Sequence, residues 1–138
     1  MLFPKGVHYF AHPYTARDGE GNLVPAAEEA NFNLCNIRAG ELLKRGYNVY
    51  SPISHTHPIH RACPAFLKNH EHKMWYHLDN QIIARMKWDG IILAPGWEDS
   101  TGCCDELDLF RGMELPNREY DEIIRTEPVI YDEEVQTQ

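Results

Sequence analysis

Short apolar stretches recur along the chain at intervals that fit strands separated by helices. Val7–Ala11 is apolar and aromatic, which predicts a buried first strand. Tyr47–Ile53 predicts a second strand, and Asp89–Ala94 predicts a third whose unbroken apolar centre suits a parallel strand covered on both faces. Pro128–Tyr131 has the composition of a last strand, while Asn117–Ile124 fits either a helix or a strand.

Apolar residues at helical spacing fill the intervals between these strands. The segment 26–45 ends before Gly46, where a C-terminal cap belongs, and its stripe consists of Ala27, Ala30, Leu34, Ile37 and Leu42. A second helix is predicted over 75–87, with a stripe of Trp75, Leu78, Ile82 and Met86. A third should begin near Gly102 or Cys103. Segments 16–25 and 54–74 are predicted as loops, the second of them functional or partly helical.

Strands that alternate with helices predict one α/β domain over residues 1–138. We expect an open, mostly parallel sheet of about five strands with helices on both faces, Rossmann-like or flavodoxin-like, and an acidic C-terminal strand and tail from about residue 126. Ligands of such sheets bind beyond the carboxyl ends of the strands. The segments 12–14, 54–57 and 96–102 are therefore expected to line one crevice.

Charge and composition exclude several classes of function. The net charge is −8, and residues 114–138 hold eight acidic and two basic residues. No basic stripe of the kind that binds duplex nucleic acid is present. The longest apolar run, Gly90–Ala94, is too short to cross a membrane, and the N-terminal sequence lacks a signal-peptide pattern. We therefore expect a cytoplasmic protein whose four cysteines are free thiols.

Two acidic residues are the main candidates for chemistry. Glu106 lies about one turn into the third predicted helix, behind a turn where Ser100 or Thr101 and free backbone N–H groups can hold an anion. Asp79 lies at the edge of the apolar stripe of the second helix. Both also fit simpler roles, as an acid that suits the helix dipole and as a surface aspartate. Together, however, two carboxylates can divide the work of cleaving a glycosidic bond.

Motifs in a fixed order resemble the nucleoside 2-deoxyribosyltransferase superfamily, especially its small bacterial and phage branch. They are Tyr9–Tyr14, Gly46–His57, Trp75 with Asp79, Asp89–Leu93, and Gly96-Trp97 followed by Ser100-x-Gly102-x-x-x-Glu106. The resemblance implies that Glu106 is the nucleophile that bonds to the anomeric carbon, and that Asp79 assists at the sugar or the leaving base. Ser100 stands where the transferases tend to carry Asp, which is similar to the deoxynucleoside 5′-monophosphate N-glycosidases, where Ser helps to bind the phosphate.

The resemblance thus implies hydrolysis of a nucleoside 5′-monophosphate without a metal or cofactor, in a protein that forms homo-oligomers. The expected substrate-binding residues are Tyr9, His12, Tyr14, His55, His57, Trp97, Ser100 and Gly102. Base exchange between nucleosides and nucleotide binding without turnover are the alternatives. Cys103 is a further possible nucleophile, because helix N-termini lower the pKa of thiols.

Six histidines fall between residues 55 and 77. The spacing His55-x-His57-x-x-His60 can bind zinc, which would make the protein a metal-dependent hydrolase. No HExxH or paired CxxC motif accompanies it, and prolines interrupt the segment. We therefore expect no metal, and consider His55 and His57 as candidates for base recognition or proton donation.

Overall fold

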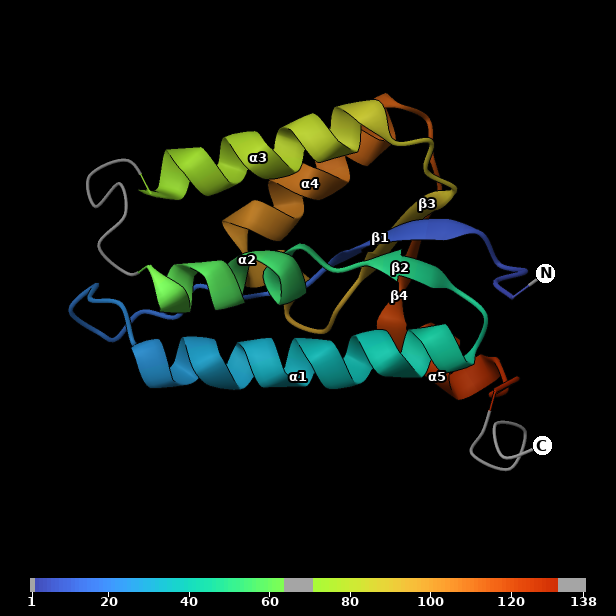
Figure 1. Cartoon of the computed structure of the whole chain (residues 1–138), viewed down its shortest axis with the longest axis horizontal. Coiled ribbons are helices and arrows are strands. Elements are labelled where there is room, and N and C mark those ends of the chain that lie inside the picture. The colour runs from blue at the N-terminus through green and yellow to red at the C-terminus, as the bar shows by residue number, and fades with distance from the viewer. Residues whose placement is uncertain (1, 64–70, 132–138) are drawn as a thin grey trace.

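A computed structural model describes residues 2–63 and 71–131, which form a four-stranded, fully parallel sheet (Figure 1). The strands are β1 (Val7–Ala11), β2 (Asn48–Tyr50), β3 (Gly90–Leu93) and β4 (Asn117–Glu119), in the order β2-β1-β3-β4. The chain first moves from β1 to β2 and then crosses back to β3 on the other side of β1. The strand order therefore reverses between β1 and β3, and this is the place where open α/β sheets bind ligands.

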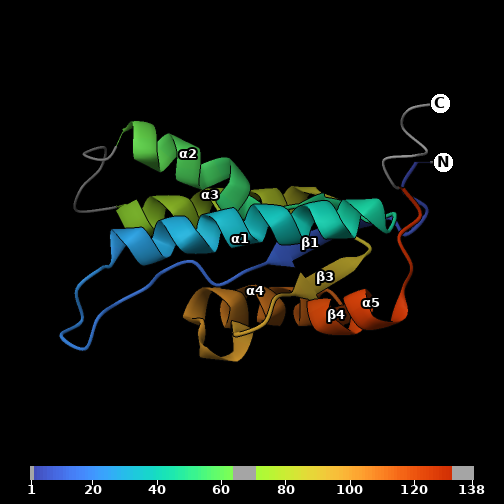
Figure 2. The ribbon, with the colours of Figure 1, turned by 90° about the horizontal axis from the view of Figure 1, so that it is seen from below.

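Helices cover both faces of the sheet, as the sequence predicts for a Rossmann-like fold. They are α1 (Pro25–Lys44), α2 (Pro52–Ala62), α3 (Glu71–Arg85), α4 (Thr101–Gly112) and α5 (Tyr120–Thr126), with a short 3-10 helix, η1, at Trp97–Asp99. Figure 1 shows α3 and α4 on one side of the strands and α1 and α5 on the other. In both views α2 lies beside the N-terminal half of α1 (Figures 1 and 2). No helix in the described ranges is long and apolar enough to cross a membrane.

Alternating side chains of the central strands divide the interior into two cores. The α1-side core contains Phe10, Phe32, Cys35, Leu42, Ile92 and Tyr120. The α4-side core contains Tyr9, Ile83, Trp88, Ile91, Leu107 and Phe110. Because both faces are covered, the β1 and β3 sequences are almost continuously apolar, and this is the pattern that made both strands predictable.

The segment 54–74, predicted as a loop that is functional or partly helical, is helical at both of its described ends, because α2 begins at Pro52 and α3 begins at Glu71. Proline is favoured at the first position of a helix, since its missing N–H has no intrahelical acceptor there. β2 accordingly ends at Tyr50 instead of running to Ile53. Histidines hid the helical periodicity, because the buried face of α2 includes His57 beside Ile53.

The predicted apolar stripes of the first two helices are also wrong in part. In α1, Leu34 is 39% and Ile37 is 65% exposed, and the buried face instead consists of Glu28, Phe32, Cys35, Ala39 and Leu42. Apolar residues occur on more than one side of α1, so spacing alone could not identify the inner side. Met86 lies just beyond the end of α3 and is 49% exposed, whereas Ile83, which was not in the predicted stripe, is buried.

The C-terminal strand predicted at Pro128–Tyr131 does not form. The N–H groups of Ile130 and Tyr131 both donate to the carbonyl of Lys44, so the segment follows the end of α1 and not the edge of the sheet. The fourth strand is β4, and the ambiguous segment 117–124 contains both this strand and the start of α5. The rest of the predicted tail, 132–138, lies outside the described residues.

Candidate active site

Glu106 is positioned by the turn that connects β3 to α4. Gly96 has φ +88°, a left-handed conformation that glycine adopts without steric cost, and η1 follows it. Ser100 then caps α4, because its Oγ accepts the N–H of Cys103 at 3.3 Å. Glu106 therefore lies in the second turn, next to the buried Leu107, and its side chain reaches the α4-side core.

The Glu106 carboxyl group meets the hydroxyl of Tyr9, whose O–H donates to Glu106 Oε2. Tyr9 is fully buried on the central strand β1, and its ring lies 5.5 Å from that of Trp88 and 5.6 Å from that of Phe110. Burial raises the pKa of Glu106 to about 8. The carboxyl group is therefore mostly protonated at neutral pH.

Asp79 provides a second carboxyl group with an unusual environment. Its Oδ1 is buried and has no hydrogen-bond partner in the described part of the chain, and burial raises its pKa to about 6. The pKa of Tyr50 is raised to about 12, first by burial and then by the nearby Asp79 carboxylate. A buried polar atom without a partner is rare in folded proteins, so Asp79 is a candidate for binding a ligand.

Tyr50 connects the two acidic residues. It pairs with Tyr9 across the neighbouring strands β1 and β2, and the two rings lie 6.0 Å apart. We call Tyr9, Tyr50, Asp79 and Glu106 the tyrosine–carboxylate cluster. The exposed His55 adjoins it, with Nδ1 3.3 Å from the Tyr50 hydroxyl. Sequence reasoning missed Tyr50, because the predicted strand ran on to Ile53 and gave no sign that Tyr50 is its last residue.

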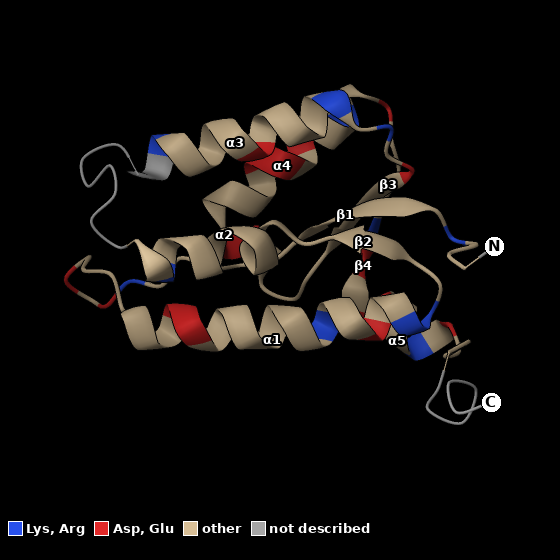
Figure 3. Cartoon of the chain, viewed as in Figure 1, with Lys and Arg blue, Asp and Glu red and all other residues tan. Residues whose placement is uncertain are grey.

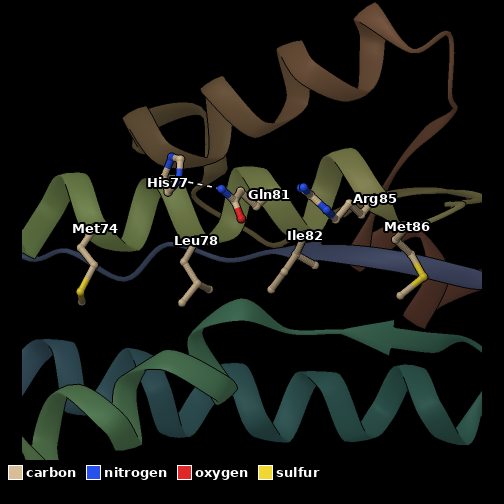
Figure 4. Close-up of a pocket in the computed structure, with 7 residues that line it drawn as sticks. All are labelled: Met74, His77, Leu78, Gln81, Ile82, Arg85 and Met86. Carbon is tan, nitrogen blue, oxygen red and sulfur yellow. Dashed lines mark hydrogen bonds between the residues drawn. The ribbon is translucent and has the colours of Figure 1, made fainter.

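Two open grooves lie along α3. The first has a volume of about 620 Å³ and is lined by Met74, His77, Leu78, Gln81, Ile82, Arg85 and Met86. Its four apolar side chains project from one side of the helix, and its polar ones from the other (Figure 4). The second, of about 570 Å³, is lined by Lys73, Tyr76, His77, Asn80 and Asp105. Neither includes Asp79 or Glu106, but the second runs past their chain neighbours Asn80 and Asp105 and so marks an approach between α3 and α4.

Tyr14 and His57 belong to a different cluster. The Tyr14 hydroxyl lies 2.6 Å from His57 Nδ1, and His57 Nε2 lies 2.5 Å from Glu29 Oε2. A carboxylate only accepts, so Nε2 carries a hydrogen and donates it to Glu29. His57 is buried against Phe32 of the α1-side core, whereas Tyr9 belongs to the α4-side core. The structure does not bring this pair together with Glu106.

The remaining predicted binding residues lie around the carboxyl ends of β1 and β3. His12 is buried, donates from Nδ1 to the Pro13 carbonyl at 2.8 Å, and has its pKa lowered by burial. Trp97 Nε1 donates to Glu119 Oε1 at 3.2 Å. A Cβ built on Gly102 would meet only Ser100 Oγ, at 4.0 Å, so packing does not require glycine there.

The structure argues against Cys103 as an alternative nucleophile. Cys103 is 1% exposed, and burial raises its pKa to about 11, so its thiol is not activated by the helix N-terminus. Across residues 2–63 and 71–131, no group of three or more His, Cys, Asp or Glu side chains is arranged to hold a metal ion. His70 and the side chain of His72 lie outside the described residues.

The chain matches the protein family described as Domain of unknown function (DUF1937) over residues 6–122. The matched region contains the whole sheet and the tyrosine–carboxylate cluster. No curated protein sequence matches the chain.

Proposed function

Because the chain belongs to the DUF1937 family, a domain family of unknown function, we propose its activity from the residues of the site itself. The protein hydrolyses the N-glycosidic bond of a nucleoside 5′-monophosphate, with Glu106 as the nucleophile and Asp79 as the second carboxylate. The observation that carries this proposal is the contact between the Tyr9 hydroxyl and Glu106, a desolvated acid that α4 presents to the central strand of a parallel sheet. The order of motifs that resembles the nucleoside 2-deoxyribosyltransferase superfamily supports the same assignment.

The reaction proceeds in two displacements. A Glu106 oxygen bonds to the anomeric carbon while the bond to the base nitrogen breaks, and the base leaves with the electron pair and takes up a proton. Water then attacks the same carbon, which releases the sugar phosphate and restores the Glu106 carboxylate. Both steps pass through a sugar that carries partial positive charge, which a carboxylate stabilises.

The raised pKa of Glu106 fits this role once the substrate is considered. The nucleophile must be ionised, but burial holds it mostly protonated without ligand. Positive charge that develops on the sugar favours the ionised carboxylate, because opposite charges at short range lower the pKa of an acid. The Tyr9 O–H donates to the same carboxyl group and stabilises the anion further.

Asp79 and Ser100 complete the proposed site. The buried Oδ1 of Asp79 has no partner in the described structure and can accept a hydroxyl of the sugar or serve the proton that the leaving base needs. The Ser100 Oγ accepts from the N–H of Cys103, and its own O–H can still donate to a phosphate oxygen. The serine at this position is the feature that favours a monophosphate substrate and hydrolysis over base exchange.

Release of free base from a panel of ribo- and deoxyribonucleosides and their 5′-monophosphates tests the proposal. Glu106→Gln should reduce base release by at least about a thousandfold, because the amide cannot form the glycosyl intermediate. Asp108→Asn, which removes an exposed acid from the same helix, is the matched control and should keep wild-type activity. Nucleotide binding without base release by the wild type would contradict the proposal. Base release only with a second free base would identify a transferase.

A further inference from the structure

Arg38 of α1 has no role in the proposed reaction, yet two residues hold its side chain in place. Its Nη1 donates to His12 Nε2 at 2.9 Å, and its guanidinium carbon lies 5.6 Å above the ring centre of Tyr120. His12 directly follows β1 and Tyr120 directly follows β4. The guanidinium is therefore held at the carboxyl edge of the sheet, where ligands of this fold class bind.

The contact with His12 leaves the charge of Arg38 unchanged. His12 Nδ1 forms a hydrogen bond with the Pro13 carbonyl oxygen. Because a carbonyl oxygen can only accept, Nδ1 carries the hydrogen of the neutral ring. Nε2 then has a lone pair, and it accepts from Arg38. Burial lowers the pKa of His12, which keeps the ring neutral at physiological pH. The pair thus holds an arginine in place without neutralising it.

No carboxylate neutralises Arg38 either. Three arginines in the described ranges are not exposed: Arg38, Arg45 and Arg118. Arg45 pairs with Glu41 at 3.1 Å, and Arg118 pairs with Glu127 at 2.6 Å. No described acidic side chain lies within 4.0 Å of the charged nitrogens of Arg38, which makes it the exception among the three.

The positive charge of Arg38 does not belong to a basic stripe. Figure 3 shows Lys and Arg dispersed along the ribbon, without a continuous basic stripe, in a chain whose net charge is −8. A single half-buried guanidinium with N–H groups left over is suited to one compact oxyanion, which it can bind with two parallel hydrogen bonds. Nucleic acid or an acidic protein surface would need several such cations.

We propose that Arg38, positioned by His12 and Tyr120, binds an oxyanion of the phosphate class at the carboxyl edge of the sheet. Pro13, the residue after His12, lies against the turn that leads to α4, since a Cβ on Gly96 would be 3.6 Å from its ring. The site therefore adjoins the loop in which Ser100 lies. The anion is either free phosphate or the phosphate of a nucleotide, and only the second assignment rests on the proposed function.

Titration of the full-length protein with inorganic phosphate, followed by calorimetry, tests the site without any turnover. Wild-type protein should bind phosphate saturably, and Arg38→Gln should weaken binding by about tenfold or more, since a charge-assisted contact is lost. Arg38→Lys keeps the charge but not the paired donors, so its affinity should fall between the two. Arg125→Gln, an exposed arginine of α5, is the control and should bind like wild type.

Absence of saturable phosphate binding by the wild type, or equal affinity in wild type and Arg38→Gln, would overturn the site. Thermal unfolding of the same variants shows that each is folded. A nucleoside and its 5′-monophosphate then identify the source of the anion: if Arg38→Gln loses affinity for the monophosphate as well as for inorganic phosphate, but not for the nucleoside, the site is assigned to the nucleotide. Loss for inorganic phosphate alone assigns it to a separate ion. Both results support the oxyanion site, even if no base is released.

Discussion

The buried carboxyl group of Glu106 should make the protein less stable as the pH rises. In the unfolded chain this group titrates near its ordinary pKa of 4.5, whereas in the folded protein burial raises the pKa to about 8. Between these values the folded state binds the proton more tightly than the unfolded state. The contribution of Glu106 to the free energy of unfolding is therefore fully present below the unfolded pKa. It decreases as the pH rises toward the folded pKa.

The size of the effect follows from the two pKa values. One pKa unit corresponds to about 1.4 kcal/mol, so ionisation of Glu106 costs the folded state roughly 3 kcal/mol at pH 7 and roughly 5 kcal/mol above pH 8. Glutamine has nearly the same shape and no charge, and its side-chain oxygen can still accept from Tyr9. Glu106→Gln should therefore match the wild type near pH 4 and exceed its stability by about 3 kcal/mol at pH 7.

Urea unfolding of wild type and Glu106→Gln at a series of pH values measures this difference, and other titrating groups cancel from it. Asp108→Asn is the control, because the exposed Asp108 on the same helix should give a difference close to zero at every pH. A Glu106→Gln difference that does not change with pH would refute the reasoning. So would a wild type that is the more stable protein at neutral pH.

Two further substitutions test the tyrosine–carboxylate cluster. Tyr9→Phe removes the O–H that donates to Glu106 and should raise the pKa of the acid further; kcat/KM for base release should then fall about tenfold at neutral pH and recover as the pH rises. An unchanged pH profile would separate Tyr9 from the titration of Glu106. Asp79→Asn removes an acid whose folded pKa is about 6, against an ordinary value of 3.8. Urea unfolding should show a gain of at most about 3 kcal/mol over wild type above pH 6 and none below pH 4, and a constant difference would contradict the burial of this carboxyl group.

The sequence predicted the strands that are buried on both faces, because their pattern needs no information from elsewhere in the chain. β1 and β3 are almost wholly apolar and lie close to where that pattern places them. α1 exposes Ile37 and buries Phe32, although both are apolar, because the choice between them depends on where the sheet lies. Local spacing identified the helix, and only tertiary packing identified its inner face.

The same distinction separates the site residues that sequence could indicate from those it could not. Glu106 follows a recognisable turn and helix start, so its place near the start of α4 was predictable. The partner of Asp79 in the cluster, Tyr50, comes from an edge strand three residues long, and no local pattern links it to α3. His55 and His57 are only two residues apart in sequence. They nevertheless contact different clusters, since two residues along a helix turn the side chain by more than half a revolution.

The net charge calculated from the sequence is a poor guide to the local charge around Glu106 and Arg38. A chain of net charge −8 suggests a surface that repels phosphate, yet the local balance depends on which charges are paired. Glu106 is held protonated by burial, and Arg38 rests on a neutral histidine. At neutral pH the protonated Glu106 makes this region less negative than a count of charges predicts, and Arg38 keeps the full positive charge that the count assigns to it. An anionic substrate is therefore compatible with this acidic protein, because the field at its edge is set by desolvation and pairing and not by the total charge.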